Sequence, residues 1–235
     1  MASQLDKEQI QLLLTTGVDR ESWPHEAVVL CVLQKENNVV FRKVYENVPK
    51  SGSSDGVHAE LVMLNDTAFQ NHFKEGQKNI EIFLVSNYSP CGNCANKLGQ
   101  FYDKNKKYLK TFTIRFSVAF RVNKEEQPIG LANLKAAGVI LESMTQESWC
   151  DLLIWSLDRL PHGIREKVKV RDGREKERLD RALQEGRKAL VQESHRKALP
   201  ESRKSEMNRG MGNLSIQDGS SPKGAGKPGP SNERY

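Results

Sequence analysis

The chain has 235 residues, of which 37% are hydrophobic and 28% charged, and its formal net charge is +6. This length and composition exclude a small disulfide-stapled module and are typical of one soluble domain with extensions. The amino-terminal residues lack the basic and then apolar profile of a secretory signal, and no apolar run approaches the length of a membrane span. We therefore expect an intracellular protein, in the cytoplasm or the nucleus, with no membrane partner.

The first half of the chain alternates between helical and strand-like patterns. Residues 5–14 have the spacing of a short amphipathic helix. Residues 27–34 and 38–48 are strand-like, and the polar residues between them suit a hairpin turn. After a loop rich in glycine and serine, helical spacing returns in residues 57–73, and residues 79–86 form a mostly apolar strand suited to the inside of a sheet.

The alternation continues in the second half. Residues 89–105 turn and enter a helix, and residues 111–122 form a long strand. Residues 128–138 have proline at the start and glycine at the end of a helical segment. Residues 139–144 are a further strand, and a threonine cap opens the helix of residues 145–157.

This order of elements predicts an α/β fold with helices packed on the faces of a sheet. The connection between the strands at 111–122 and 139–144 is a helix of about ten residues rather than a tight turn. A helical crossover of this kind places the second strand parallel to the first. We therefore expect the last two strands of the sheet to be parallel.

The composition changes near Pro161, which divides the chain into three parts. We expect a folded core in residues 1–160, basic helices in residues 161–200 packed on the core or extending from it, and a disordered tail in residues 201–235. The tail has too few apolar residues to offset its ordering entropy. Residues 159–204 hold 15 Lys/Arg against 8 Asp/Glu. This local excess of positive charge indicates a polyanionic partner.

One histidine and two cysteines form a pattern that indicates a metal site. His58 stands where a helix begins, and Cys91 and Cys94 are three residues apart in the first turn of a later helix. This spacing lets both thiolates face one point, and the positive end of the helix favours the thiolate form. One nitrogen and two sulfurs leave the fourth tetrahedral position of a Zn2+ ion open for water, as in catalytic zinc sites.

Glu60 is placed to serve that water without binding the metal. Zinc lowers the pKa of such a water towards neutrality, and a carboxylate two residues beyond the ligand can relay its proton.

Two other interpretations of the histidine and cysteine pattern remain open. A structural zinc site requires a fourth ligand, and Cys31 and Cys150 lie in apolar segments typical of a core. A redox C-x-x-C pair leaves His58 and Glu60 without a role.

These residues match the H-x-E and P-C-x-x-C signature of zinc deaminases. Over roughly residues 5–160 the chain resembles the zinc-dependent cytidine deaminase superfamily, and within it the AID/APOBEC branch that acts on polynucleotides. The stretch SNYSPCGNCA is similar to the S-W-S-P-C-x-x-C-A motif of that branch, and GLANLKAAGVILESMTQESWCDLL resembles its final helix–strand–helix segment. The resemblance implies a three-layer α/β/α fold, in which about six helices flank a five-stranded mixed sheet whose last two strands are parallel.

The resemblance also implies an activity and a set of substrate contacts. The activity is hydrolytic conversion of cytosine to uracil in single-stranded DNA or RNA, with one Zn2+ per chain and Glu60 moving the proton from water to N3 and to the leaving amine. The Ala59 backbone and Ser89 would hold the edge of the pyrimidine, and Tyr88 would provide an aromatic wall. Asn47, in the loop before the motif, would lie near the sugar.

One departure from the branch concerns the substrate. The branch has a tyrosine after its fourth strand that packs on the target base, and this chain has Ser117 or Ala119 there, with Phe116 and Phe120 nearby. Because stacking on an aromatic ring contributes about 1–3 kcal/mol per base, its loss would weaken polynucleotide binding or change the substrate.

Three functions therefore remain in competition. The first is a polynucleotide cytosine deaminase, monomeric or weakly oligomeric. The second is a deaminase of free nucleosides, which usually oligomerises to close its site. The third is a zinc-containing nucleic-acid-binding protein with weak or no catalysis, against which the presence of Glu60 argues.

Overall fold

The computed structural model describes residues 6–18, 24–50, 56–122, 124, 126–153 and 161–198, and for residues 150–153 only the backbone. The tail expected to be disordered, residues 201–235, lies outside the described residues. Within this described chain, no helix has both the length and the apolar character needed to span a bilayer.

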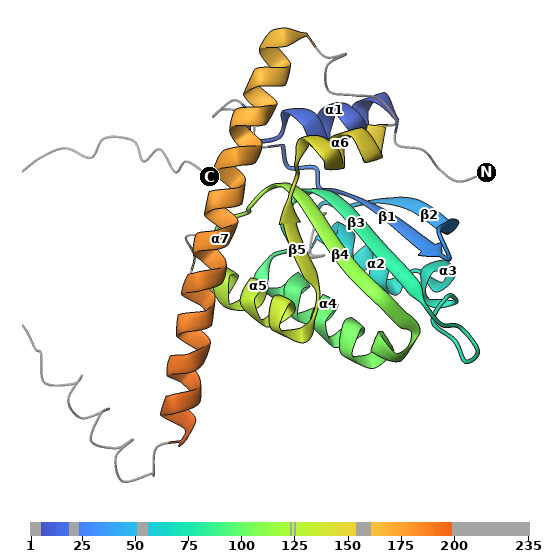
Figure 1. Cartoon of the computed structure of the whole chain (residues 1–235), viewed down its shortest axis with the longest axis vertical. Coiled ribbons are helices and arrows are strands. Elements are labelled where there is room, and N and C mark those ends of the chain that lie inside the picture. The colour runs from blue at the N-terminus through green and yellow to red at the C-terminus, as the bar shows by residue number, and fades with distance from the viewer. Residues whose placement is uncertain are drawn as a thin grey trace, which may run out of the picture. The chain divides into compact units, whose positions relative to one another are not determined.

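The strands form one mixed sheet in the order β2-β1-β3-β4-β5 (Figure 1). They are β1 (Val28–Lys35), β2 (Asn38–Glu46), β3 (Ile80–Tyr88), β4 (Leu109–Val118) and β5 (Ile140–Ser143). β1 pairs antiparallel with β2 and β3, whereas β4 pairs parallel with β3 and with β5. The predicted five-stranded sheet with two parallel final strands is confirmed.

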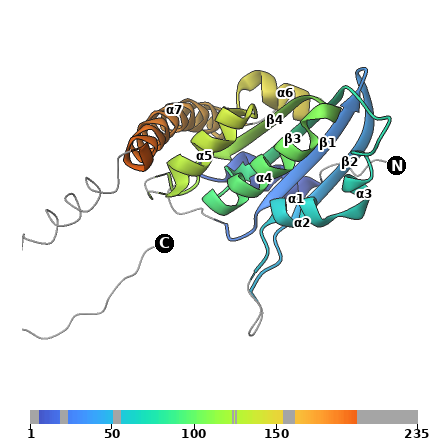
Figure 2. The same ribbon diagram turned by 90° about the horizontal axis from the view of Figure 1, so that it is seen from below.

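Seven α-helices flank this sheet in the described chain (Figures 1 and 2). They are α1 (Lys7–Thr15), α2 (Ala59–Asn65), α3 (Thr67–Gln70), α4 (Gly92–Asn105), α5 (Glu126–Ala137), α6 (Gln146–Leu153) and α7 (His162–Ala198). Helices α2 to α5 cover one face and α1 and α6 the other, so the predicted three-layer α/β/α fold is confirmed.

Each face of the sheet has its own hydrophobic core, because successive strand residues point to opposite faces. Ile82 and Leu84 of β3 enter the core under α2 to α5, whereas Val85 of the same strand enters the core under α1 and α6. The largest apolar side chains of the helices complete these cores, among them Met63, Phe69, Leu98 and Leu131 on the first face and Leu13, Leu14 and Trp149 on the second.

The single helix expected over residues 57–73 is divided at Asp66. This residue has extended backbone (φ −72°, ψ 117°), and its carboxylate accepts the Ala68 N–H at 2.9 Å to cap α3. The same carboxylate accepts hydrogen bonds from Lys43 at 2.8 Å and Tyr45 at 2.6 Å. The break thus comes from an N-cap that also ties α3 to β2.

The strand expected over residues 111–122 ends earlier, at Val118. Beyond it the Ala119 N–H donates to the Glu175 carboxylate of α7 instead of a neighbouring strand, at 3.0 Å. Arg121 then adopts a positive φ of 45°, which turns the chain away from the sheet. The strand pairing of β4 therefore ends at Val118, and the chain continues as a loop held by α7.

Helix α7 packs on the fold along a narrow apolar stripe. Leu179, Ala182 and Leu183 are buried, and up to Gln192 the chain belongs to one compact unit. At Gly186 a Cβ atom would collide with the Pro128 carbonyl oxygen, so only glycine permits this close crossing with α5. Figure 2 shows α7 beside α5.

Candidate functional site

Two helix N-termini meet at the carboxyl end of β3. Backbone at His58 is extended and α2 begins directly after it. After β3 ends at Tyr88, the chain turns and Cys91 forms the N-cap of α4, with its sulfur accepting the Cys94 N–H at 3.4 Å. An extended residue thus precedes each helix, and this local geometry directs the side chains of His58, Cys91 and Cys94 towards one point.

The three ligand atoms are close enough to share one ion. His58 Nδ1 lies 3.4 Å from Cys91 Sγ and 3.3 Å from Cys94 Sγ. All three atoms lie within 4.8 Å of one another, and within the described chain no other histidine, cysteine or carboxylate joins the group. A tetrahedral zinc site with ordinary bond lengths separates its nitrogen and sulfur ligands by about 3.6 Å. The donor set and its spacing therefore fit such an ion.

The protein environment favours the thiolate at Cys91. Its sulfur accepts hydrogen bonds from the Cys94 thiol, the His58 ring and the Cys94 backbone, which lowers the pKa of Cys91 well below its usual value. The hydrogen bond to Cys91 in turn raises the pKa of His58. Thiolate is the form in which cysteine binds metals, so these hydrogen bonds favour the form of Cys91 that binds a cation.

Glu60 lies beside the ligands but is not one of the group. It stands in the first turn of α2 with 8% of its surface exposed. Burial raises the pKa of its carboxyl group, which is hydrogen-bonded to its own backbone N–H and to the Cys94 thiol. The structure thus brings the predicted ligands and the predicted proton carrier into one cluster. Ala59, between them, is fully buried.

An aromatic pair lies where β3 and β4 end, and Tyr88 stands three residues before Cys91 in the chain. The Tyr88 and Phe120 rings have centroids 5.3 Å apart, tilted by 60°. The Tyr88 hydroxyl donates to the Pro24 carbonyl at 2.8 Å, and the Arg121 guanidinium lies 5.0 Å from the centroid of the Phe120 ring. We refer to Tyr88 and Phe120 as the aromatic wall.

Ser89 connects the two halves of the aromatic wall. Its backbone N–H donates to the Val118 carbonyl at 2.8 Å, and its side-chain oxygen accepts the Phe120 N–H at 2.9 Å. Ser89 is buried, so these two bonds fix the end of β3 against the loop after β4. Its predicted contact with a pyrimidine stays a prediction.

A family model described as invertebrate AID/APOBEC deaminase matches residues 9–190 of the chain. The chain belongs to this family. The resemblance to AID/APOBEC deaminases is therefore confirmed, and the match continues beyond residue 160 into α7. A search of curated proteins finds no match to this deaminase.

Of the two phenylalanines near the missing tyrosine of this deaminase, Phe120 is the one that faces Tyr88. Ser117 and Ala119, the two positions considered for the missing tyrosine, are fully buried, as is Phe116. Ser117 donates its hydroxyl proton to the Leu13 carbonyl at 2.7 Å, on the side of α1. Because the end of β4 is buried on both faces, the alternation of its side chains cannot indicate which aromatic residue faces Tyr88.

Gln127 is a residue that the sequence did not reveal. Its side-chain oxygen accepts the Gly92 N–H at 2.8 Å, and its side-chain nitrogen donates to the Pro90 carbonyl at 2.9 Å. These bonds hold the turn that carries Cys91 against α5. The two partners lie some 35 residues away in sequence, so only the folded chain shows the contact.

Asn47 makes contacts with the main chain at the amino end of β1. Its side-chain oxygen accepts the Ala27 N–H at 2.6 Å, and its nitrogen donates to the His25 carbonyl at 3.3 Å. These bonds account for an asparagine at this position. Its predicted place near a sugar stays a prediction.

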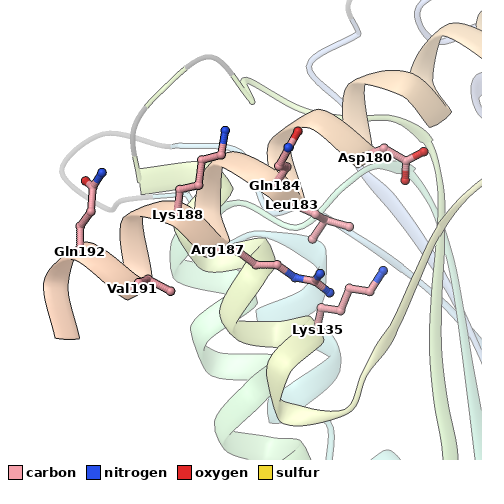
Figure 3. A pocket seen from close by; sticks show the side chains of 8 residues that line it. All are labelled: Lys135, Asp180, Leu183, Gln184, Arg187, Lys188, Val191 and Gln192. Atoms are coloured by element: carbon pink, nitrogen blue, oxygen red, sulfur yellow. The ribbon is translucent and has the colours of Figure 1, made fainter. Parts of the chain in front are cut away.

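A groove of about 520 Å³ lies between α5 and α7, apart from the metal-ligand cluster (Figure 3). Leu183 and Val191 provide its apolar part, and Arg187 extends from α7 towards Lys135 of α5. The remaining lining residues are Asp180, Gln184, Lys188 and Gln192. None of the predicted ligands or substrate contacts lines this groove, which we call the α5–α7 groove.

Proposed function

We propose that this deaminase hydrolyses cytosine to uracil in single-stranded DNA or RNA, with Zn2+ held by His58, Cys91 and Cys94. The observation that carries the proposal is the buried Glu60 carboxylate beside three ligand atoms that fit one tetrahedral ion. A purely structural site has no use for such a carboxylate. The parallel β4 and β5 also favour the polynucleotide branch over the nucleoside deaminases, whose last strands turn back antiparallel.

The proposed chemistry divides between the ion and the chain. When bound by three protein ligands, zinc keeps its fourth position for water and lowers the pKa of that water towards neutrality. Glu60 takes one proton from the attacking water and delivers it to N3 of cytosine, and then carries the second proton, from the hydroxyl group formed at C4, to the exocyclic amine. The amine leaves as ammonia, and the water oxygen becomes O4 of uracil.

The aromatic wall would receive the base after it leaves the stack, which single-stranded substrates allow at the least cost. Phe120→Leu is expected to raise KM for an oligonucleotide by about 5- to 160-fold, because stacking contributes about 1–3 kcal/mol per base. Steady-state kinetics on a single-cytosine oligonucleotide measure this. Phe120→Tyr is the matched control, since it keeps the ring. Equal KM values for the leucine variant and the wild type would show that Phe120 does not contact the base.

Cations of the α5–α7 groove would contact the phosphate backbone. Among the described residues, no acidic side chain pairs with Lys135, Arg187 or Lys188, and all three are exposed. By contrast, Lys43 pairs with Asp66 at 2.8 Å. Arg115 likewise pairs with Glu142, at 2.9 Å.

The double variant Arg187→Glu with Lys188→Glu is therefore expected to weaken oligonucleotide binding. It should also reduce the slope of log Kd against log salt by about 1 for each phosphate that the variant no longer neutralises. Fluorescence anisotropy over a salt series measures both quantities. Lys74→Glu with Lys78→Glu, two exposed positions, makes the same change in net charge. An equal loss of affinity in this control would point to net charge rather than to the groove.

The proposal is tested by measuring uracil formation from a single-stranded DNA oligonucleotide, its RNA counterpart and free cytidine in parallel. Product from either polymer supports it. Turnover of cytidine alone would instead identify a nucleoside deaminase, and light scattering would then be expected to show a stable oligomer. Binding of the polymer without product would identify the inactive binder.

A further inference from the structure

Helix α7 carries three buried charged residues that the proposed chemistry does not use. Arg171 and Glu175 are at most 1% exposed, and Asp172 is 8% exposed. Burying ionised side chains is costly unless each finds partners. The partners of these residues therefore show which parts of the fold α7 holds.

Arg171 and Asp172 hold α1 and α6. One Arg171 nitrogen donates to three carbonyl oxygens at the end of α1, those of Leu13, Leu14 and Thr16, at 3.1, 2.8 and 2.9 Å. Asp172 pairs with Arg171 at 2.9 Å and accepts the Trp149 indole N–H at 2.8 Å. This pair satisfies carbonyls that a helix end leaves open, so its role is structural.

Glu175 makes a different contact, with the loop after β4 that carries Phe120. One carboxylate oxygen accepts the Ala119 N–H at 3.0 Å. Arg174 donates to the other oxygen at 3.0 Å, and Arg178 donates to both, at 3.0 and 2.9 Å. Because Ala119 is fully buried, its amide would have no acceptor from solvent if this carboxylate were absent.

Two consecutive amides after β4 are thus held from different directions. Glu175 of α7 holds the N–H of Ala119, and Ser89 holds the N–H of Phe120 at 2.9 Å. The peptide plane between them determines the direction in which the Phe120 side chain leaves the backbone. That ring faces Tyr88, with the centroids 5.3 Å apart.

We propose that Glu175 is a positioning residue for the aromatic wall. By accepting the Ala119 amide it fixes the loop after β4, so that Phe120 faces Tyr88 before a substrate arrives. Arg174 and Arg178 orient the carboxylate, and Arg174 also donates to the Gly17 carbonyl at 2.7 Å. The proposal rests on the proposed function in one respect, which is that the aromatic wall receives a base.

Glu175→Gln tests this position, because an amide has one acceptor oxygen and cannot serve Ala119 and both arginines at once. In hydrogen–deuterium exchange followed by mass spectrometry, we expect faster exchange confined to the peptide that contains Ala119 and Phe120. In kinetics on the oligonucleotide, we expect KM to rise about tenfold with kcat within about twofold. Glu185→Gln, at an exposed position on the same helix, is the matched control and should change neither quantity.

A double-mutant cycle separates positioning from a general loss of stability. If Glu175 acts through Phe120, then Glu175→Gln should change KM by less than about twofold in a Phe120→Leu background. Should Glu175→Gln fail to fold, Arg178→Gln takes its place and should change exchange and KM in the same direction. The proposal is overturned if exchange near Ala119 is unchanged, or if the KM effect persists in full without the ring. A wild-type protein that makes no uracil would refute the proposed function instead, while the exchange measurement would still decide the role of Glu175.

Discussion

Glu60→Gln is expected to lower kcat for cytosine deamination by about 10²- to 10⁴-fold while the protein keeps its metal. Proton transfer by a positioned carboxylate contributes a factor of this size, and an amide of the same shape cannot carry the proton. Glu60 lies outside the ligand group, so its loss should leave the ion in place. Single-turnover kinetics on an oligonucleotide and zinc analysis of the same sample provide the two readings.

Glu75→Gln is the control for this substitution, because it makes the same chemical change at an exposed position. It should match the wild type in both readings. If the Glu60→Gln protein deaminates at more than about one third of the wild-type rate, Glu60 does not carry the proton in the reaction. Loss of zinc from that variant would instead identify Glu60 as a contributor to the metal site.

Cys94→Ser is expected to abolish both metal binding and activity. Cys94 is fully buried, and among the described residues it supplies one of the three ligand atoms that lie together, so its loss leaves an incomplete ligand set. Since metal binding to the folded state adds to folding free energy, the variant should also have a lower Tm. A chelator should lower the Tm of the wild type towards that of the variant, and should leave the Tm of the variant unchanged.

Cys31→Ala controls for the loss of a buried sulfur. Cys31 is also fully buried but lies in β1, in the core under α2 to α5. This variant should lose some stability through the cavity it creates, yet it should keep its metal and its response to the chelator. A Cys94→Ser protein that retains one metal ion per chain would contradict the assignment of Cys94 as a ligand.

The sequence was sufficient to predict the sheet and the metal-ligand cluster because both depend on short-range patterns. A helix between two strands determines that β4 and β5 are parallel, whichever side chains pack against them. His58, Cys91 and Cys94 each lie at the start of a helix, where local chemistry already indicates how the side chain is directed. Such features need little information from the rest of the chain.

The residues that shape the rest of the site could not be predicted in this way. Gln127 holds the turn at Gly92, and Glu175 holds the amide of Ala119, across separations of 35 and 56 residues. Both side chains lie in helices whose sequence explains them equally well as surface polar groups. Only the packing of α5 and α7 on the fold converts them into buried partners of the loops around the site.

Metal analysis of the purified wild-type protein tests the central claim most directly, since the chemistry assigned to Glu60 depends on an ion at His58, Cys91 and Cys94. Native mass spectrometry combined with elemental analysis is expected to find one zinc ion per chain. A folded chain that contains no stoichiometric metal after purification without chelators would contradict the account.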